Sequence, residues 1–369
     1  MMHDLNYLLT SEGIEYRFAA FLYQDVEHLR THIEHKGFDA LLAVLPEVWQ
    51  EPHRDDNTYE VIKQRIEVPS QCIQQDHTLP ESWTNRPVKE FMQAQPRLAR
   101  RIRQWYEMSI WNLLVKHHWV PFAPNDPFHY NVHVGFDVGG QHNNRAMACL
   151  GYGFARPREG LCFRPEEIPI DVQQAEPIST NCLYRGLLRL FETTYADLQG
   201  TGCVPSFDTT LFFRDGRLLG DGDDWNEIDA LKKLHQVLLD RGWVSNQSVW
   251  TAVEVMKQAE EWRWLCHHEE VTNPLVGQAI LPFDEENMAL VCTTGTPYLS
   301  QGTASPLKVC ALDIYGCACM EEVVRDLIWE ADMCFTKPDT GLSLPWVLHV
   351  ADTGALQLAR SYQIAGITA

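Results

Sequence analysis

The chain has 369 residues, of which 45% are hydrophobic and 22% are charged, so it has the composition of a globular protein long enough for two domains. No stretch approaches the roughly 20 uninterrupted apolar residues of a membrane helix, and we expect no export signal. The formal net charge of −20 argues against a generally basic nucleic-acid binder. The eleven cysteines lack paired CxxC spacing, which favours reduced thiols, a cytoplasmic location and no structural zinc.

The first third of the chain predicts an alternation of strands and helices. A helix over residues 25–37, closed by Gly37, lies between apolar strands over 14–24 and 38–46, which favours a parallel sheet. The pattern continues with a helix over 58–67, a short strand over 68–73 and a long helix over 96–118. Three prolines at 121, 124 and 127 then interrupt it, so we place a domain boundary between residues 126 and 127.

Basic residues gather in one part of this acidic chain. Between Thr84 and His118, seven Lys or Arg side chains accompany only two Glu side chains. A solvated helix face explains such a run most simply, and contact with a nucleic-acid backbone is the alternative. The arginines concerned are Arg97, Arg100, Arg101 and Arg103.

The second part of the chain predicts a different order of elements. A hairpin over 133–140 and 145–154 and a third strand over 161–170 precede a helix over 181–198. A strand over 208–216 and a capped helix over 223–242 follow, with Asp221, Asp223 and Asp224 as loop and N-cap residues. Three strands, a helix, a strand and a helix is the order of a ribonuclease H-like core. Further strands over 248–257, 287–295 and 307–315 lead to helices over 319–335 and 350–363.

Three aspartates lie at the ends of these elements. Asp137 lies in the first strand, and Asp215 ends the strand LFFRD. Asp352 lies where the apolar segment LPWVLHV meets the last helix. His349 in that segment is expected to pack as in a strand, and a position beside the aspartates is the alternative. Each aspartate alone is most simply a cap or a turn former. Together they match the needs of Mg²⁺, which prefers hard oxygen ligands. Two such ions about 4 Å apart can promote cleavage of a phosphodiester.

Four segments of the second part, in order, resemble the PIWI domain of prokaryotic Argonautes. They are HVGFDVGG, LFFRDGR, TTGTPYLSQGTASPLKV and LPWVLHVADTGALQLARSY. The resemblance implies an α/β protein of the short form, with a Rossmann-like MID domain over 1–126 and a ribonuclease H-like PIWI domain over 127–369. It implies catalytic and metal-binding roles for Asp137, Asp215 and Asp352. Glu176 best matches the family's fourth carboxylate, and the nearby alternatives are Glu166, Glu167 and Glu192.

The first part resembles the MID domain, which grips the 5′ phosphate of a guide strand. Tyr59 and Lys63 are one helical turn apart, so they share a helix face, and Gln71 follows shortly after. The simpler alternative is that the Tyr59 side chain packs within the domain and the Lys63 side chain is exposed to solvent. The remaining residues implied are Asn112, Lys116 and the carboxyl-terminal Ala369, although the interval from Gln71 to Lys116 is longer than the family pattern.

The resemblance implies two alternative functions. In the first, the protein is a guide-directed endonuclease that uses Mg²⁺ or Mn²⁺ to cut a complementary target in defence against invading DNA. In the second, it is a guide-loaded target sensor that does not cut and acts through a partner protein, which also replaces absent N and PAZ domains. The resemblance to short forms of the family implies an RNA guide and a DNA target. A third possibility, an unguided ribonuclease H-like nuclease, conflicts with the set of Tyr59, Lys63 and Gln71.

Overall fold

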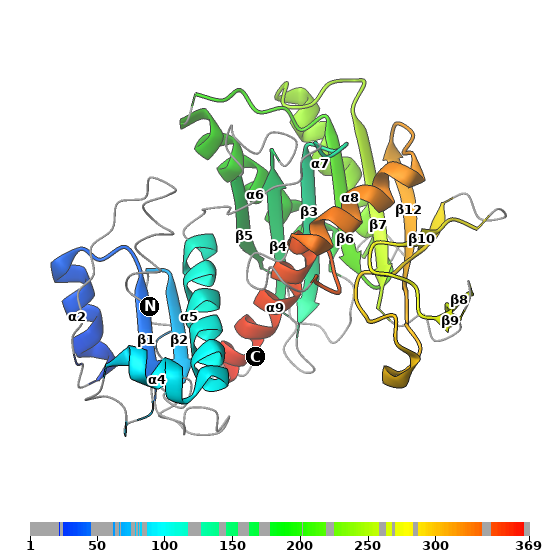
Figure 1. The fold of residues 1–369 in the computed structure, drawn as a ribbon. Coiled ribbons are helices and arrows are strands. Elements are labelled where there is room, and N and C mark those ends of the chain that lie inside the picture. The colour runs from blue at the N-terminus through cyan, green and yellow to red at the C-terminus, as the bar shows by residue number, and fades with distance from the viewer. Residues whose placement is uncertain are drawn as a thin grey trace. The chain divides into compact units, whose positions relative to one another are not determined.

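The protein forms two compact units, Met1–Pro121 and Phe122–Ala369 (Figure 1). The predicted boundary at 126/127 lies at the end of residues 117–126, which the structure does not describe, and the assignment of the two domains stays a prediction. None of the helices in the described ranges combines the length and apolarity that a membrane span needs. This computed structural model describes residues 22, 25–45, 62, 66, 68–74, 78, 80, 82, 87–116, 127–139, 145–153, 162–169, 178–200, 202–218, 225–257, 263–267, 270–282, 287–333 and 341–364.

The smaller unit contains the predicted helix and two of the predicted strands. Helix α2 spans Val26–Lys36; the Asp25 side chain accepts a hydrogen bond from the His28 amide at its start, and Gly37 ends it with φ +64°. Strands β1 (Leu41–Leu45) and β2 (Ser70–Gln74) pair in parallel, as expected. The predicted strand over 14–24 and helix over 58–67 lie almost wholly outside the described residues.

Two further helices complete the described part of this unit. Helix α4 (Val88–Ala94), which the sequence did not lead us to expect, precedes the predicted long helix α5 (Pro96–Lys116). Phe91, Ala99 and Ile102 form a small apolar cluster between them. The opposite side of α5 is exposed and carries the arginines Arg97, Arg100, Arg101 and Arg103.

The larger unit is built on one mixed sheet of eight strands in the order β10-β11-β12-β7-β6-β3-β4-β5. The central strands β3, β6 and β7 are parallel to one another, and every other neighbouring pair is antiparallel. A separate two-stranded ribbon is formed by β8 (Cys266–His267) and β9 (Val271–Thr272). The sheet strands are β3 (Val132–Gly139), β4 (Arg145–Tyr152), β5 (Cys162–Ile168), β6 (Thr209–Asp215), β7 (Val249–Met256), β10 (Ala279–Ile280), β11 (Met288–Val291) and β12 (Leu307–Tyr315).

Helices cover both faces of this sheet, so the unit has three layers. Helices α6 (Thr180–Gly200) and α7 (Glu227–Asp240) pack on the face that carries Phe136 and Phe212, in one apolar core. Helices α8 (Met320–Asp332) and α9 (Trp346–Ile364) lie on the opposite face, where α9 crosses β3 and β4 (Figure 1). Because side chains alternate along a strand, the odd-numbered residues of β3 point toward α9.

Two local predictions in this unit are wrong. Residues 346–350 are the first turns of α9 and not a strand, so His349 lies on a helix and Asp352 lies one turn further along it. The Pro345 carbonyl accepts the His349 amide at 2.8 Å, which begins the helix. The N-cap of α7 is Asn226, whose side chain accepts from the Asp229 amide; residues 221–224 lie outside the described part.

Candidate functional site

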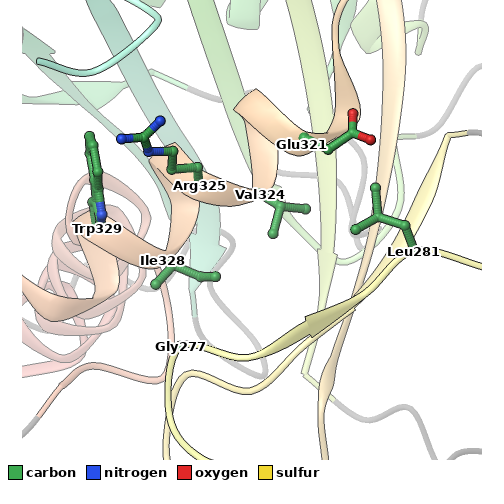
Figure 2. A pocket seen from close by; sticks show the side chains of 7 residues that line it. All are labelled: Gly277, Leu281, Glu321, Val324, Arg325, Ile328 and Trp329. Atoms are coloured by element: carbon green, nitrogen blue, oxygen red, sulfur yellow. The ribbon is translucent and has the colours of Figure 1, made fainter. Parts of the chain in front are cut away.

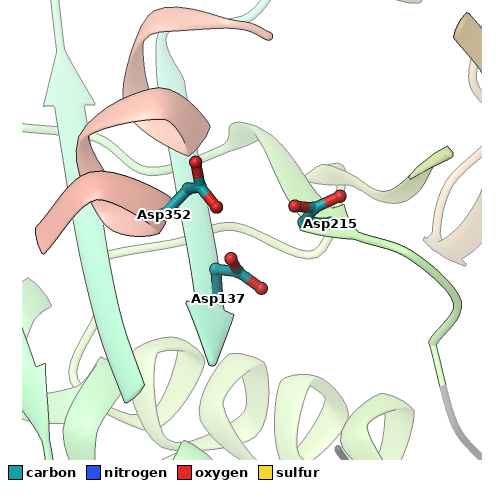
Figure 3. A group of neighbouring side chains, drawn as sticks. All are labelled: Asp137, Asp215 and Asp352. Atoms are coloured by element: carbon teal, nitrogen blue, oxygen red, sulfur yellow. The ribbon is translucent and has the colours of Figure 1, made fainter. Parts of the chain in front are cut away.

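Three aspartates from three separate elements meet at one edge of the sheet. Asp137 comes from β3, Asp215 is the last residue of β6, and Asp352 comes from α9. One carboxylate oxygen from each lies within 4.8 Å of the others, and the three side chains point into a common space (Figure 3). Asp137 is buried, whereas Asp215 and Asp352 are half-buried. The sequence prediction that these residues converge is therefore confirmed.

Glycines of β3 allow helix α9 to come close enough for this convergence. A Cβ at Gly135 would lie 2.4 Å from the backbone nitrogen of Leu348, and one at Gly139 would lie 2.5 Å from the backbone carbon of Ala355. Such distances are impossible for a real side chain, so any other residue would push α9 away from the strand. The GxDxG spacing therefore places Gly135, Asp137 and Gly139 on the same face of β3. The two glycines allow close backbone contact with α9, and the Asp137 side chain lies between them.

A buried charged network fixes the start of α9 and of β3 to helix α8. The Glu330 carboxylate contacts the ring of His133 and accepts the backbone amide of Val347, in the first turn of α9, at 3.2 Å. One turn earlier, Asp326 accepts the backbone amides of His129 and Tyr130. Burial alone would lower the pKa of His133, but the neighbouring Glu330 and Asp326 outweigh burial and raise it to about 9. The imidazolium thus joins the two acids of α8 to β3.

Arg214 is the permanent counter-charge of the cluster. Its side chain is 4% exposed, and its Nη1 donates to Asp137 Oδ1 at 2.8 Å and to the Asp215 carbonyl at 2.7 Å. Its Nε lies 3.4 Å from the fully buried Glu227 of α7. A guanidinium stays charged and bonds in a fixed planar geometry, so Arg214 orients Asp137 rather than exchanging with solvent.

Lys257 is a second cation at the same cluster and follows directly after β7. Its ammonium lies 2.5 Å from Asp215 Oδ2 and 3.2 Å from Asp352 Oδ1, so it bridges two of the three aspartates. Burial would lower the pKa of Lys257, but the hydrogen bonds and charges of Asp215 and Asp352 outweigh it and raise that pKa. Its side chain is 39% exposed, unlike that of Arg214.

The oxygen donors of the cluster suit a divalent cation. Burial raises the pKa of Asp137 to about 7; Arg214 opposes this shift, and the charges of Asp215 and Asp352 add to it. Three carboxylates held this close repel one another unless cations compensate them. Hard oxygen donors on a rigid strand and helix are the ligands that Mg²⁺ and Mn²⁺ prefer. The donor set therefore fits such an ion.

The predicted fourth carboxylate is not placed by the structure. Glu176 lies outside the described residues. Each of its three alternatives forms an ion pair with an arginine: Glu166 with Arg189 at 2.8 Å, Glu167 with Arg145 at 3.8 Å and Glu192 with Arg241 at 2.7 Å. In the part of the chain that is described, the three-aspartate group is the one acidic cluster with metal-binding geometry.

The predicted guide-binding residues are described only in part. Tyr59, Lys63 and Ala369 lie outside the described residues, and Lys116 ends α5 without a described side chain. Gln71 is the second residue of β2 and is half-buried. Asn112 of α5 donates to the carbonyl of Met108 at 2.9 Å. Their predicted role at a guide phosphate stays a prediction.

The exposed arginines of α5 differ in how strongly they are engaged. Arg103 forms an i,i+4 ion pair with Glu107 at 2.7 Å, and Arg101 lies over the ring of Trp105. Arg97 and Arg100 are exposed on the same side of the helix. The face is basic because a single glutamate accompanies four arginines over this stretch.

A separate hollow of about 250 Å³ lies between α8 and the turn before β10 (Figure 2). Val324 and Ile328 of α8 lie on the side of the hollow toward Gly277 and Leu281, and Trp329 lies beside Arg325. Arg325, also on its wall, has its guanidinium 4.3 Å from the centre of the Trp329 ring. None of the residues lining this hollow belongs to the aspartate cluster.

The fold resembles that of known structures. The chain matches Clostridium butyricum Argonaute, solved with a guide DNA and a 19-mer target DNA, at a TM-score of 0.62 and 15% identity over 94% of this chain. The chain has the Argonaute fold. It also matches A. aeolicus Argonaute, including a structure with externally bound siRNA, at a TM-score of 0.53 and 16% identity over 97% of this chain. No protein-family model and no curated protein sequence matches the chain.

The chain spans less than half of each of these two Argonautes. It covers 42% of the Clostridium butyricum protein and 45% of the A. aeolicus protein. At 15–16% identity, the likeness concerns the course of the backbone and not individual side chains. The roles of individual residues therefore depend on the local geometry described above.

Proposed function

We propose that this chain is the MID and PIWI part of a prokaryotic Argonaute of the short form and that it cuts a target strand selected by a bound guide. The MID domain would span 1–126 and the PIWI domain 127–369. The strand arrangement supports a ribonuclease H-like PIWI domain, since an antiparallel β3-β4-β5 meander is followed by β6 and β7 parallel to β3. The convergence of Asp137, Asp215 and Asp352 is the observation that carries the proposal.

The three aspartates would hold the divalent cations, Mg²⁺ or Mn²⁺, at the edge of the sheet. When bound, such ions supply activation of a water molecule and charge stabilisation at the leaving oxygen of a phosphodiester. Asp137 provides a rigid ligand because Arg214 fixes one of its oxygens. Asp215 and Asp352 provide ligands that are open to solvent on one side, where a nucleic-acid strand can approach. Glu176 is proposed as the fourth carboxylate.

Guide binding is proposed for the smaller unit. Lys63 would supply a cation to the 5′ phosphate, Tyr59 a ring for the first base, and Gln71, Asn112 and Lys116 hydrogen-bond donors. The terminal carboxylate of Ala369 would help to hold a metal ion at that phosphate. The exposed arginines of α5 would contact the nucleic-acid backbone, for which phosphate attraction supplies most of the affinity. An RNA guide and a DNA target are the preferred pair.

One observation favours the non-cutting alternative. Arg214 and Lys257 already engage all three aspartates, so the cluster is partly neutralised by the protein itself. A short form that senses a target and signals through a partner protein would need the fold and the guide pocket but no cations at the cluster. An assay of target cleavage therefore distinguishes the two functions, whereas an assay of guide loading does not, because both functions require a bound guide.

Purification followed by sequencing of the bound nucleic acid tests the shared part of the proposal. The wild-type protein should carry short strands of uniform length with a 5′ phosphate. Lys63→Ala should reduce the amount that copurifies, and Asp215→Ala should not, because the two residues serve different sites. Equal loading of the wild type and Lys63→Ala would remove the assignment of the guide pocket.

A further inference from the structure

The two cations at the aspartate cluster differ in how easily they leave it. Arg214 is 4% exposed and is held by Asp137, by Glu227 and by the carbonyl of Asp215. Lys257 is 39% exposed, and its long stem starts at the end of β7, so its ammonium can turn into solvent without moving the sheet. An ammonium is a compact point charge on four rotatable bonds, in contrast to the fixed guanidinium.

The Lys257 ammonium uses the oxygens that a divalent cation would need. It contacts Oδ2 of Asp215 at 2.5 Å and Oδ1 of Asp352 at 3.2 Å. A Mg²⁺ ion binds carboxylate oxygens at about 2.1 Å, so an ion on the same two oxygens would lie within a few ångströms of the ammonium. Repulsion between a single and a double positive charge at this separation is large even near solvent. Both cations therefore cannot hold these oxygens at the same time.

We propose that Lys257 is a displaceable counter-ion of the metal site. In the cation-free protein its ammonium bridges Asp215 and Asp352 and stabilises their convergence. A divalent cation binds by displacing it, so Lys257 weakens metal affinity and sets the metal concentration at which the site fills. This inference rests on the proposed function, since it concerns the same cluster. It assigns to Lys257 the regulation of metal loading rather than contact with the reacting atoms.

Mn²⁺ titration of the chelator-treated full chain, with free Mn²⁺ measured by electron paramagnetic resonance, tests the inference without an activity assay. Lys257→Met removes the charge but keeps the length of the side chain, and Lys257→Gln provides a polar second variant. Lys232→Met is the matched control, because Lys232 is a lysine beside an aspartate, Asp229, at 3.8 Å on the surface of α7. Asp215→Asn reports on the metal site itself.

We expect Lys257→Met and Lys257→Gln to bind Mn²⁺ at least about tenfold more tightly than the wild type. Lys232→Met should match the wild type, and Asp215→Asn should bind more weakly. Mn²⁺ should also raise the melting temperature of Lys257→Met by more than it raises that of the wild type. If Asp215→Asn weakens binding and the Lys257 variants bind as the wild type or more weakly, the counter-ion role is overturned and the metal site stands. If the wild type, the lysine variants and Asp215→Asn all bind no Mn²⁺, both the counter-ion role of Lys257 and the metal site are overturned.

Discussion

Gly135 of β3 lies against the backbone of Leu348 in α9, where a Cβ would stand 2.4 Å from the Leu348 nitrogen. This close approach sets the height of α9 above the sheet. Asp352 is one turn further along the same helix, and Asp137 is two residues further along the same strand. The separation of these two carboxylates therefore depends on a residue without a side chain.

Gly135→Ala should lift α9 and loosen the cluster. We expect a loss of at least about 2 kcal/mol in the free energy of unfolding of the larger unit, because the added methyl group meets backbone that cannot turn aside. Mn²⁺ affinity should fall as well, since Asp352 moves with α9. Gly200→Ala is the control: this residue ends α6, and nothing lies within 4 Å of the position of its Cβ. Chemical denaturation and Mn²⁺ titration of both variants check the prediction, which fails if they behave alike.

Replacement of Arg214 should leave two buried acids without their counter-charge. Arg214→Met leaves Asp137 and the fully buried Glu227 without their shared guanidinium, and breaking a buried ion pair from one side costs about 3–5 kcal/mol. Arg217→Met, at an exposed position three residues further, should change the free energy of unfolding by less than about 0.5 kcal/mol. Urea denaturation compares the two. If Arg214→Met and Arg217→Met have the same free energy of unfolding, Arg214 is not needed to compensate the charges of Asp137 and Glu227.

The network of His133, Asp326 and Glu330 should make the larger unit less stable in alkali. The pKa of His133 is raised from 6.5 to about 9 in the folded state, so its contribution is complete below about pH 6.5 and is lost as the pH rises through about 9. The loss between pH 6.5 and pH 10 should be on the order of 3 kcal/mol. Chemical denaturation of the wild type and of His133→Gln at both pH values measures this loss. The contribution of His133 is the fall in the free energy of unfolding of the wild type minus that of the variant.

The exposed His267→Gln controls for the loss of any histidine and should follow the wild type. If the wild type and His133→Gln lose the same stability over this pH interval, the imidazolium is not the link between α8 and β3. A fall in stability below about pH 4 would instead implicate Asp326. The pKa of Asp326 is lowered, because bonds from His133 and the Tyr130 amide outweigh its burial, so its contribution is lost as the pH falls through that pKa.

The arginine face of α5 should account for part of the salt dependence of nucleic-acid binding. Combined Arg97→Gln, Arg100→Gln and Arg101→Gln should weaken binding of single strands of any sequence. The slope of log affinity against log salt should become shallower by about 0.7 for each phosphate that an arginine no longer neutralises. Arg103→Gln should have a smaller effect, because Glu107 already pairs with Arg103. Fluorescence anisotropy across a salt series checks this, and an unchanged slope in the triple variant would contradict it.

The positions of Asp137 and Asp215 could be predicted because strand patterns are local. Alternating or continuous apolar residues located β3 and β6, and parallel neighbours end at the same edge of a sheet. The start of α9 could not be predicted in the same way. The segment from Leu344 to Leu348 is buried, and such an apolar run does not distinguish a strand from a helix. Pro345 at its start was the available signal for a helix.

The two counter-charges were missed for different reasons. Arg214 stands beside Asp215 in the sequence, but its partners Asp137 and Glu227 are distant in the chain, and only the fold brings them together. Lys257 follows β7 just as Asp215 ends β6, and these strands are parallel neighbours. That common edge placed Lys257 near the cluster, yet one lysine after a strand carries no local pattern.

Cleavage of a labelled target strand paired to the loaded guide, in Mn²⁺ and under single-turnover conditions, tests the central claim most directly. The wild type should cut at one position, and Asp215→Ala should lose at least about a thousandfold in rate while carrying the same amount of guide, since the cluster loses a cation ligand. Asp240→Ala, at the end of α7, should cut like the wild type. An uncut target with the wild-type protein, or an equal rate in Asp215→Ala, would contradict a catalytic metal site at these three aspartates.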